Sequence, residues 1–248
     1  MERRLVYFIS DAHLGLRQGD PAGREARLVG FLKGIPRDAK ALYLLGDMWD
    51  FWYEYRDVVP KTGARVVSEL IQLMDAGVEV FFFEGNHDIW TYSFFESLGM
   101  KKLSQPSFLE IGGKTFCVGH GDALGGAKRS YRFMMKIFHS RICQVLFSTL
   151  HPWIAYRFGN AWSNSSRRSH APYQFRGADE PLYAFAADVL RKRPVDYFIF
   201  GHFHCYVDME IPAPMDGTAP SRLLVLKDWM GGNQPHALFD GEKLVNIE

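Results

Sequence analysis

Aspartate, asparagine and histidine residues gather in five short groups along this sequence, most of them beside glycine. The groups are Asp11-Ala12-His13, Gly46-Asp47, Gly85-Asn86-His87-Asp88, Gly119-His120-Gly121-Asp122 and Gly201-His202-Phe203-His204. Each group alone has an ordinary structural explanation as a turn, a cap or a hydrogen-bonded core histidine. All five together are harder to explain in that way, because burying several carboxylates and imidazoles without compensation costs kilocalories per group.

Cations are the natural compensation for such a set of side chains. Oxygen and imidazole donors without a thiolate suit divalent ions such as Mn²⁺, Fe²⁺ or Zn²⁺. This set is too large for one ion that keeps positions open to a substrate. Two ions that share one carboxylate fit the set better.

Short apolar strands are the elements that must position these groups. Five apolar runs each lead directly into one polar group, and a sixth follows them, at Leu5–Ile9, Ala41–Leu45, Val78–Phe83, Thr115–Val118, Tyr197–Phe200 and Leu223–Leu226. Such runs indicate strands that are buried on both faces. Residues 25–33 and 65–75 carry apolar side chains at three- and four-residue spacing, which predicts helices between the early strands.

The alternation of strand and helix predicts an α/β layered fold. Ligands bind such sheets at the carboxyl ends of the strands, so we expect the five polar groups to converge there. His202 and His204 should point in the same direction, because alternate residues of a strand do.

Length and composition set the class of protein. The 248 residues, 47% of them apolar, suffice for one large α/β domain with an insertion and exclude a disordered chain. Three scattered cysteines do not suit a disulfide framework or a zinc cluster, which favours a cytoplasmic location. The run Leu5–Ile9 is too short for a signal peptide, and no run approaches the ~20 apolar residues of a membrane-spanning helix.

The stretch from Ala123 to Ala178 contains no aspartate or glutamate. Its nine basic residues are Lys128, Arg129, Arg132, Lys136, Arg141, Arg157, Arg167, Arg168 and Arg176, although the net charge of the chain is only +1. Two interpretations are open: a solvated helix face, or a contact with a phosphate, a nucleic acid or an anionic lipid surface. We interpret residues 1–248 as a single domain with a helical insertion at about 125–178, whose residues 129–150 form one or two helices broken by Pro152.

The five polar groups, in this order, resemble the calcineurin-like metallophosphoesterase superfamily. That resemblance implies a four-layer α/β/β/α sandwich with two divalent metal ions, of which Mn²⁺ is the expected species. Its metal ligands would be Asp11, His13 and His204 for one ion, Asn86, His120 and His202 for the other, and Asp47 between the two. His87 would be catalytic and not a ligand, stabilising the transition state or protonating the leaving group, with Asp88 orienting its imidazole.

The insertion is similar to the helical cap of the UDP-2,3-diacylglucosamine hydrolases, here in a divergent branch with a Gly-Asn-His-Asp motif. The similarity rests on His120-Gly121-Asp122, Tyr131, Leu150-His151-Pro152 and the Asn/Ser-rich residues 164–167. It implies cleavage of the pyrophosphate of UDP-2,3-diacylglucosamine to UMP and a diacylated glucosamine 1-phosphate for lipid A, at the cytoplasmic face of the inner membrane. The expected substrate contacts are Tyr131, Ser166, Arg167 and His170.

The composition of the insertion suits a lipid-bearing diphosphate. Apolar residues such as Met134, Met135 and Phe138 could line an acyl chamber, while the basic residues could hold the diphosphate or an anionic membrane surface. The alternative is that the apolar residues only dock the insertion on the core. Aliphatic and Met residues stack poorly on bases, so we expect no nucleic-acid partner.

The sequence is also compatible with two other functions. Another phosphoesterase, such as a nucleotide phosphodiesterase or a pyrophosphatase for unacylated sugar nucleotides, would use the same metal site. A non-catalytic binding module of the same fold would have lost metal ligands, yet all seven positions are filled here.

Overall fold

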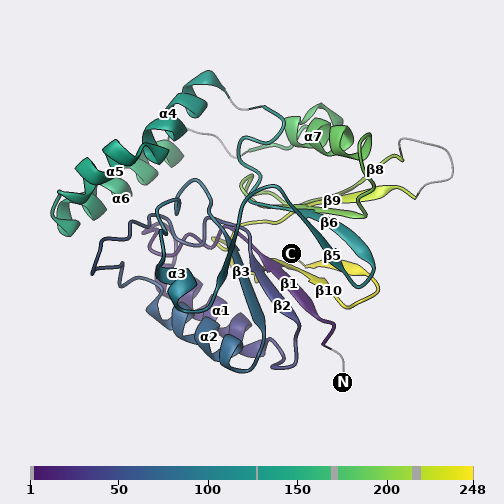
Figure 1. Cartoon of the computed structure of the whole chain (residues 1–248), viewed down its shortest axis with the longest axis horizontal. Helices are drawn as coiled ribbons and strands as arrows, with labels where there is room; N and C mark the ends of the chain where they lie inside the picture. The colour runs from purple at the N-terminus through teal and green to yellow at the C-terminus, as the bar shows by residue number, and fades with distance from the viewer. Residues whose placement is uncertain (1–2, 127, 169–172, 214–218, 248) are drawn as a thin grey trace.

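The computed structural model describes residues 3–126, 128–168, 173–213 and 219–247, and two β-sheets form its centre (Figure 1). The first sheet has the order β11-β10-β1-β2-β3-β4, and the second has the order β5-β6-β7-β9-β8. Strands of the first sheet are β1 (Val6–Ile9), β2 (Ala41–Leu44), β3 (Glu79–Phe83), β4 (Lys101–Leu103), β10 (His236–Phe239) and β11 (Leu244–Ile247). Strands of the second are β5 (Ser107–Ile111), β6 (Lys114–Val118), β7 (Tyr197–Phe200), β8 (Val207–Ile211) and β9 (Ser221–Val225).

Both sheets have a run of parallel strands, which antiparallel strands extend at one edge of the first sheet and at both edges of the second. Strands β1, β2, β3 and β4 are parallel neighbours in the first sheet, and β6, β7 and β9 are parallel neighbours in the second. Strands β10 and β11 extend one sheet by antiparallel pairing, and β5 and β8 extend the other. The carboxyl ends of the parallel strands therefore lie together at one end of each sheet, where ligands usually bind.

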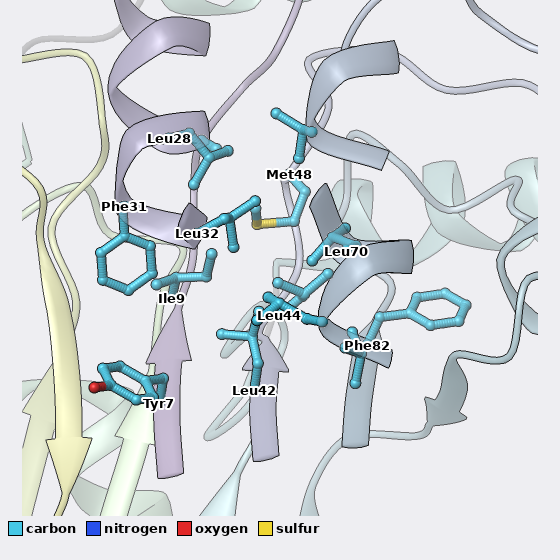
Figure 2. Close-up of a cluster of buried hydrophobic side chains, with 14 of the residues drawn as sticks. Tyr7, Ile9, Leu28, Phe31, Leu32, Leu42, Leu44, Met48, Leu70 and Phe82 are labelled. Atoms are coloured by element: carbon cyan, nitrogen blue, oxygen red, sulfur yellow. The ribbon is translucent and has the colours of Figure 1, made fainter. Parts of the chain in front are cut away.

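Alternating side chains of the central strands build the core on both faces of the first sheet. Tyr7, Ile9, Leu42 and Leu44 pack against helices α1 (Pro21–Gly34) and α2 (Ala64–Asp75) in one buried cluster (Figure 2). Residues of opposite parity, such as Val6, Phe8 and Tyr43, pack instead against Phe116, Ile199 and Leu224 of the second sheet. The continuous apolar runs of the sequence reflect this burial on two faces.

Helix α7 (Pro181–Leu190) covers the outer face of the second sheet. Its Leu182 and Ala186 lie in a cluster with Phe198, Leu223 and Val225. The order of layers is thus helices, sheet, sheet, helix, which confirms the expected α/β/β/α sandwich. A short helix, α3 (Phe94–Ser97), and a 3₁₀ turn, η1 (Gly177–Asp179), complete these layers.

Three helices lie beside the sandwich, near the loops that follow β2 and β3 (Figure 1). They are α4 (Arg129–His139), α5 (Arg141–Ser148) and α6 (Pro152–Arg168). Residues 129–150 thus form two helices, and Pro152 begins a third helix, because proline fits the first helical position. We call α4, α5 and α6 the cap helices. Within the described residues, no helix combines the length and apolar character needed to cross a bilayer.

Candidate metal centre

The five polar groups of the sequence lie at the carboxyl ends of five strands. Asp11 and His13 follow β1, Asp47 follows β2, and Asn86 to Asp88 follow β3, all in the first sheet. His120 follows β6, and His202 and His204 follow β7, in the second sheet. Ligand atoms from these loops approach within 4.8 Å of one another in overlapping groups that draw on both sheets. The expected convergence is therefore present.

An unusual backbone conformation aims most of these side chains. Six non-glycine residues among those described have a positive φ, and five of them belong to the candidate site: Asp11 at 53°, His13 at 43°, Asp47 at 51°, His202 at 70° and His204 at 54°. The left-handed region costs about 1–2 kcal/mol for each such residue, and strain of this kind collects at functional sites. The sequence-based reason for pairing His202 with His204 was wrong in one respect. Both lie beyond β7, so left-handed turns and not strand alternation orient them.

Two glycines let the ligand loops approach each other closely. A Cβ atom on Gly85 would overlap the carboxylate and backbone nitrogen of Asp47. A Cβ atom on Gly201 would overlap the hydroxyl of Ser10 and the carboxylate of Asp11. These glycines occupy the positions next to Asn86 and His202, so glycine is required there for the loops to meet.

Asp11, His13 and His204 form the first of two groups of candidate ligands. Nε2 of His13 lies 3.7 Å from Oδ1 of Asp11, and Nε2 of His204 lies 3.8 Å from the same oxygen. These separations exceed hydrogen-bond length, and Oδ1 of Asp11 is buried without a hydrogen-bond partner among the described residues. A fully buried carboxylate oxygen facing two imidazole nitrogens suits a shared cation.

Asp47, His120 and His202 form the second group, with Asn86 beside them. Oδ2 of Asp47 lies 3.3 Å from Nε2 of His120 and 3.8 Å from Nε2 of His13, so this carboxylate stands between the two groups. Oδ1 of Asn86 lies 3.3 Å from Nε2 of His120. All seven donors are oxygen or imidazole nitrogen atoms, and the set fits two divalent ions that prefer such ligands.

Electrostatic coupling within this cluster is strong. Burial alone would raise the pKa of Asp47, but His120 and His87 hold that pKa well below its usual range. Burial alone would lower the pKa of His120, but the Asp47 carboxylate holds that pKa well above its usual range. Burial, followed by the charge of His120, lowers the pKa of His202 to about 4.

Residues 5–206 match the family model described as calcineurin-like phosphoesterase. The chain belongs to the calcineurin-like phosphoesterase family. A UDP-2,3-diacylglucosamine hydrolase from Porphyromonas gingivalis is 36% identical over 98% of this chain and 97% of its own length. The hydrolases of that name from Neisseria meningitidis serogroup B and Klebsiella pneumoniae are 34% and 28% identical, over 80% and 90% of this chain and 82% and 90% of theirs. The protein is therefore a hydrolase whose family uses a dinuclear metal centre.

Sequence analysis missed two carboxylates of this phosphoesterase, each of which lies behind a candidate ligand histidine. Oδ1 of Asp50 lies 3.4 Å from Nδ1 of His13, and Oδ2 of Asp228 lies 3.1 Å from Nδ1 of His204. Such pairs fix the orientation of a histidine so that Nε2 faces the metal. Asp228 follows β9 much as the other polar residues follow their strands, so the same pattern could have identified it. Asp50 lies in a loop among aromatic residues, where no such pattern was available.

His87 lies at the edge of the site, with 19% of its side chain exposed. Its ring packs edge-on against that of His13, with 5.0 Å between the centroids, and its Nδ1 lies 2.9 Å from the carbonyl oxygen of Asp50. The carboxylate of Asp88 accepts hydrogen bonds from the backbone N–H groups of Gly85, Asp47 and Trp49. Asp88 thus connects the loops that follow β2 and β3. The group next to Nδ1 of His87 is the backbone carbonyl of Asp50.

The structure describes the four candidate substrate contacts to different extents. Tyr131, in the first turn of α4, donates a 2.7 Å hydrogen bond to Asp122, which also accepts one from Gln105. Ser166 and Arg167 belong to α6, but only their backbone is described. His170 lies outside the described residues.

The aromatic segment after Asp47 divides into two sets. Trp49 and Trp52 are buried in the core under α1 and α2. Phe51, Tyr53 and Tyr55 instead turn to the cap helices, where Phe51 packs on Tyr156 and Tyr53 packs on Phe147. The segment therefore serves both the core and the support of the cap.

Proposed function

We propose that this protein hydrolyses the pyrophosphate bond of UDP-2,3-diacylglucosamine, releasing UMP and 2,3-diacylglucosamine 1-phosphate. The observation that carries the proposal is the 36% identity to a hydrolase of that name along 97% of its length, because this match includes the cap helices as well as the metal site. A phosphoesterase with another substrate would share the metal-binding loops without needing a similar cap.

The proposed metal site has two positions. Asp11, His13 and His204 would hold one ion, and Asn86, His120 and His202 would hold the other. Asp47 would bridge them, since its Oδ2 atom faces both His13 and His120. Mn²⁺ is proposed as the ion expected for this family, and a donor set of three oxygens and four imidazole nitrogens without a thiolate is compatible with it. When bound, the two ions would supply Lewis-acid stabilisation of the phosphoryl oxygens and an acidified water.

The protein's own residues would orient the reacting groups. Asp50 and Asp228 hold His13 and His204 in place through their Nδ1 atoms. His87 is a partly exposed imidazole at the rim, where it would donate a proton or hydrogen bond to the transition state or the leaving group. Tyr131, Ser166, Arg167 and His170 are the proposed contacts to the sugar and phosphate.

The cap helices would receive the acyl chains and meet the membrane. These helices and the turn between α5 and α6 expose many large apolar side chains: Phe133, Ile137, Ile142, Val145, Leu146, Leu150, Trp153, Ile154, Phe158 and Trp162. Lys128, Arg129, Arg132, Lys136, Arg141 and Arg157 are exposed in the same segment. Apolar and basic side chains together are typical of segments that lie on an anionic membrane surface, so we place the protein at the cytoplasmic membrane face.

A comparison of substrates tests this function. Manganese-loaded protein is incubated with UDP-2,3-diacylglucosamine, with UDP-N-acetylglucosamine and with bis-p-nitrophenyl phosphate, and UMP and nitrophenol are quantified. The Asp47→Asn variant is the blank. Preferential release of UMP from the acylated substrate is expected. Equal or faster turnover of the unacylated compounds would mean that the protein is a phosphoesterase of a different specificity.

A further inference from the structure

Hydrogen bonds from aromatic side chains attach the cap helices to the loops that follow β2 and β3. In three of them a phenol or indole of the loops donates to a carbonyl of residues 138–150, and in a fourth Tyr156 of α6 donates to the Tyr53 carbonyl. The first three bonds run from Tyr53 to the Gln144 carbonyl at 2.7 Å, from Tyr55 to Leu150 at 3.2 Å and from Trp90 to Phe138 at 2.9 Å. Phe138 lies in the last turn of α4, where carbonyls lack partners within the helix.

Trp90 lies at the centre of this attachment. Its ring is within aromatic contact of four others, two from the loop after β2 and two from the cap helices. The centroid distances are 5.7 Å to Phe51, 5.5 Å to Tyr53, 5.2 Å to Phe138 and 5.8 Å to Phe147. The indole is only partly buried, so its position depends on these contacts and on the single hydrogen bond to Phe138. Aromatic pairs of this geometry add to the stability that burial alone provides.

The same loops carry the candidate catalytic groups. Trp90 is three residues after His87, and Tyr53 is three residues after Asp50, which contacts both His13 and His87. The two loops are joined by an isolated bridge between Tyr53 and Trp90 and by a 3.0 Å hydrogen bond from the Glu54 N–H to the Trp90 carbonyl. The attachment of the cap and the rim of the metal centre are therefore one continuous structure.

Helix α6 makes a second close contact with this structure. Gly159 is buried, and a Cβ atom added there would overlap the ring of Phe51. The backbone of α6 can lie directly on the ring because residue 159 has no side chain. The distance between the cap and the metal-binding loops is thus fixed by packing at two separate points.

We infer that Trp90 is a positioning residue that determines specificity for the acylated substrate. It sets the place of the cap relative to the metal centre, so that one molecule can put its acyl chains under the cap and its diphosphate at the metals. This inference rests on the proposed function. A small phosphodiester that does not reach the cap gains nothing from that placement.

Variants at residue 90 test the inference against a control elsewhere. Trp90→Phe keeps a ring but removes the hydrogen bond to Phe138, and Trp90→Leu removes both. Phe108→Leu is the matched control, because Phe108 is a half-buried aromatic residue of β5 that packs against the α7 cluster and not against the cap. For each protein, kcat and KM are measured with UDP-2,3-diacylglucosamine and with bis-p-nitrophenyl phosphate, and thermal unfolding is recorded.

Trp90→Leu should lower kcat/KM for the acylated substrate about tenfold, mainly through KM, because misplacement of a binding element costs productive binding. Its activity on bis-p-nitrophenyl phosphate should change less than about twofold. Trp90→Phe should show a smaller loss in the same direction, and Phe108→Leu should leave the ratio of the two activities unchanged even where it lowers Tm.

An equal fall of both activities in Trp90→Leu would overturn the inference, since it would reveal general destabilisation. The same shift of the ratio in Phe108→Leu would also overturn it. If the wild-type protein does not hydrolyse the acylated substrate, the proposed function itself is wrong and the inference falls with it. If the wild type does and the ratio never shifts, only the inference is wrong.

Discussion

The candidate ligand residues of this protein are held in place by their backbone conformation, and two of the histidines are also held by a carboxylate at Nδ1. At the backbone, left-handed turns direct Asp11, His13 and Asp47 inward from their strand ends. Behind two of the imidazoles, the Asp50 carboxylate lies next to Nδ1 of His13 and the Asp228 carboxylate lies next to Nδ1 of His204. A metal site built in this way is preorganised, and its affinity should depend on residues that never touch the ion.

Asp228→Asn should weaken metal binding while leaving the fold intact. Without the carboxylate, His204 loses the partner that lies 3.1 Å from its Nδ1 atom. Removal of such a partner typically costs 10- to 100-fold in affinity, so we expect about a tenfold increase of the Kd for Mn²⁺, measured by competition with a chelating dye. Asp240→Asn, at an exposed turn before β11, is the control. An unchanged Kd in Asp228→Asn would contradict this role.

His236, in β10 and away from the metal centre, should make the protein less stable in acid. Burial lowers its pKa from the usual 6.5, since the ring packs against Phe31 and Tyr7. The unfolded chain then binds a proton at this residue more readily than the folded chain. Stability from the neutral ring is therefore present above pH 6.5 and is lost as the pH falls through that value.

Urea unfolding at pH 7.5 and pH 5.5 tests this for the wild type and His236→Gln. On acidification, the wild type should lose more free energy of unfolding than the variant, which has no titrating group there. Parallel losses in the two proteins would show that His236 does not contribute to the pH dependence.

Among the secondary-structure elements, the parallel strands determine the position of the candidate site, because the polar residues follow their carboxyl ends. The apolar runs of the sequence predict β1, β2, β3, β6, β7 and β9, and their polar ends meet as expected, because burial on both faces leaves a clear signal. No sequence pattern predicted the pairing of Asp50 with His13, because the two residues are distant in sequence and only the fold brings them together. The contacts of Tyr53 and Trp90 with the cap helices could not be predicted from the sequence either, because an aromatic residue in a loop suits a core as well as an interface.

Gly85→Ala should disrupt the metal site by displacing the loops that carry the candidate ligands. The new methyl group would overlap the carboxylate and the backbone nitrogen of Asp47, so the β2 and β3 loops would have to separate. We expect Mn²⁺ affinity to fall at least about tenfold, as for other losses of ligand geometry. Gly30→Ala, in the middle of α1 with nothing within 4 Å of the added atom, is the control. It should bind metal normally and unfold at the same or a higher temperature, because alanine favours helix. Normal Mn²⁺ affinity in Gly85→Ala would contradict the need for glycine there.

The whole molecule combines a compact sandwich with cap helices whose surface is basic and apolar. Ile142 is 75% exposed and Leu146 is 64% exposed, on α5. Such exposure is unusual for a water-facing helix and is favourable at a lipid surface.

Ile142→Glu should therefore reduce binding to vesicles that contain phosphatidylglycerol. Loss of one buried aliphatic contact and gain of a negative charge should weaken binding about tenfold or more in a sedimentation assay. Val245→Glu, on β11, also places a charge at an exposed valine but outside the cap, and it should bind as the wild type does. Equal binding by Ile142→Glu and wild type would contradict membrane contact through the cap helices.

The metal content of the protein tests the central claim most directly. Protein dialysed to equilibrium against Mn²⁺ is analysed for manganese per chain, in the wild type and in Asp47→Asn. If Asp47 bridges two ions held by the other six ligands, the wild type should bind two ions and the variant no more than one, and only the wild type should show a spin-coupled pair by electron paramagnetic resonance. A single ion per chain in the wild type, or two retained in Asp47→Asn, would contradict the dinuclear site.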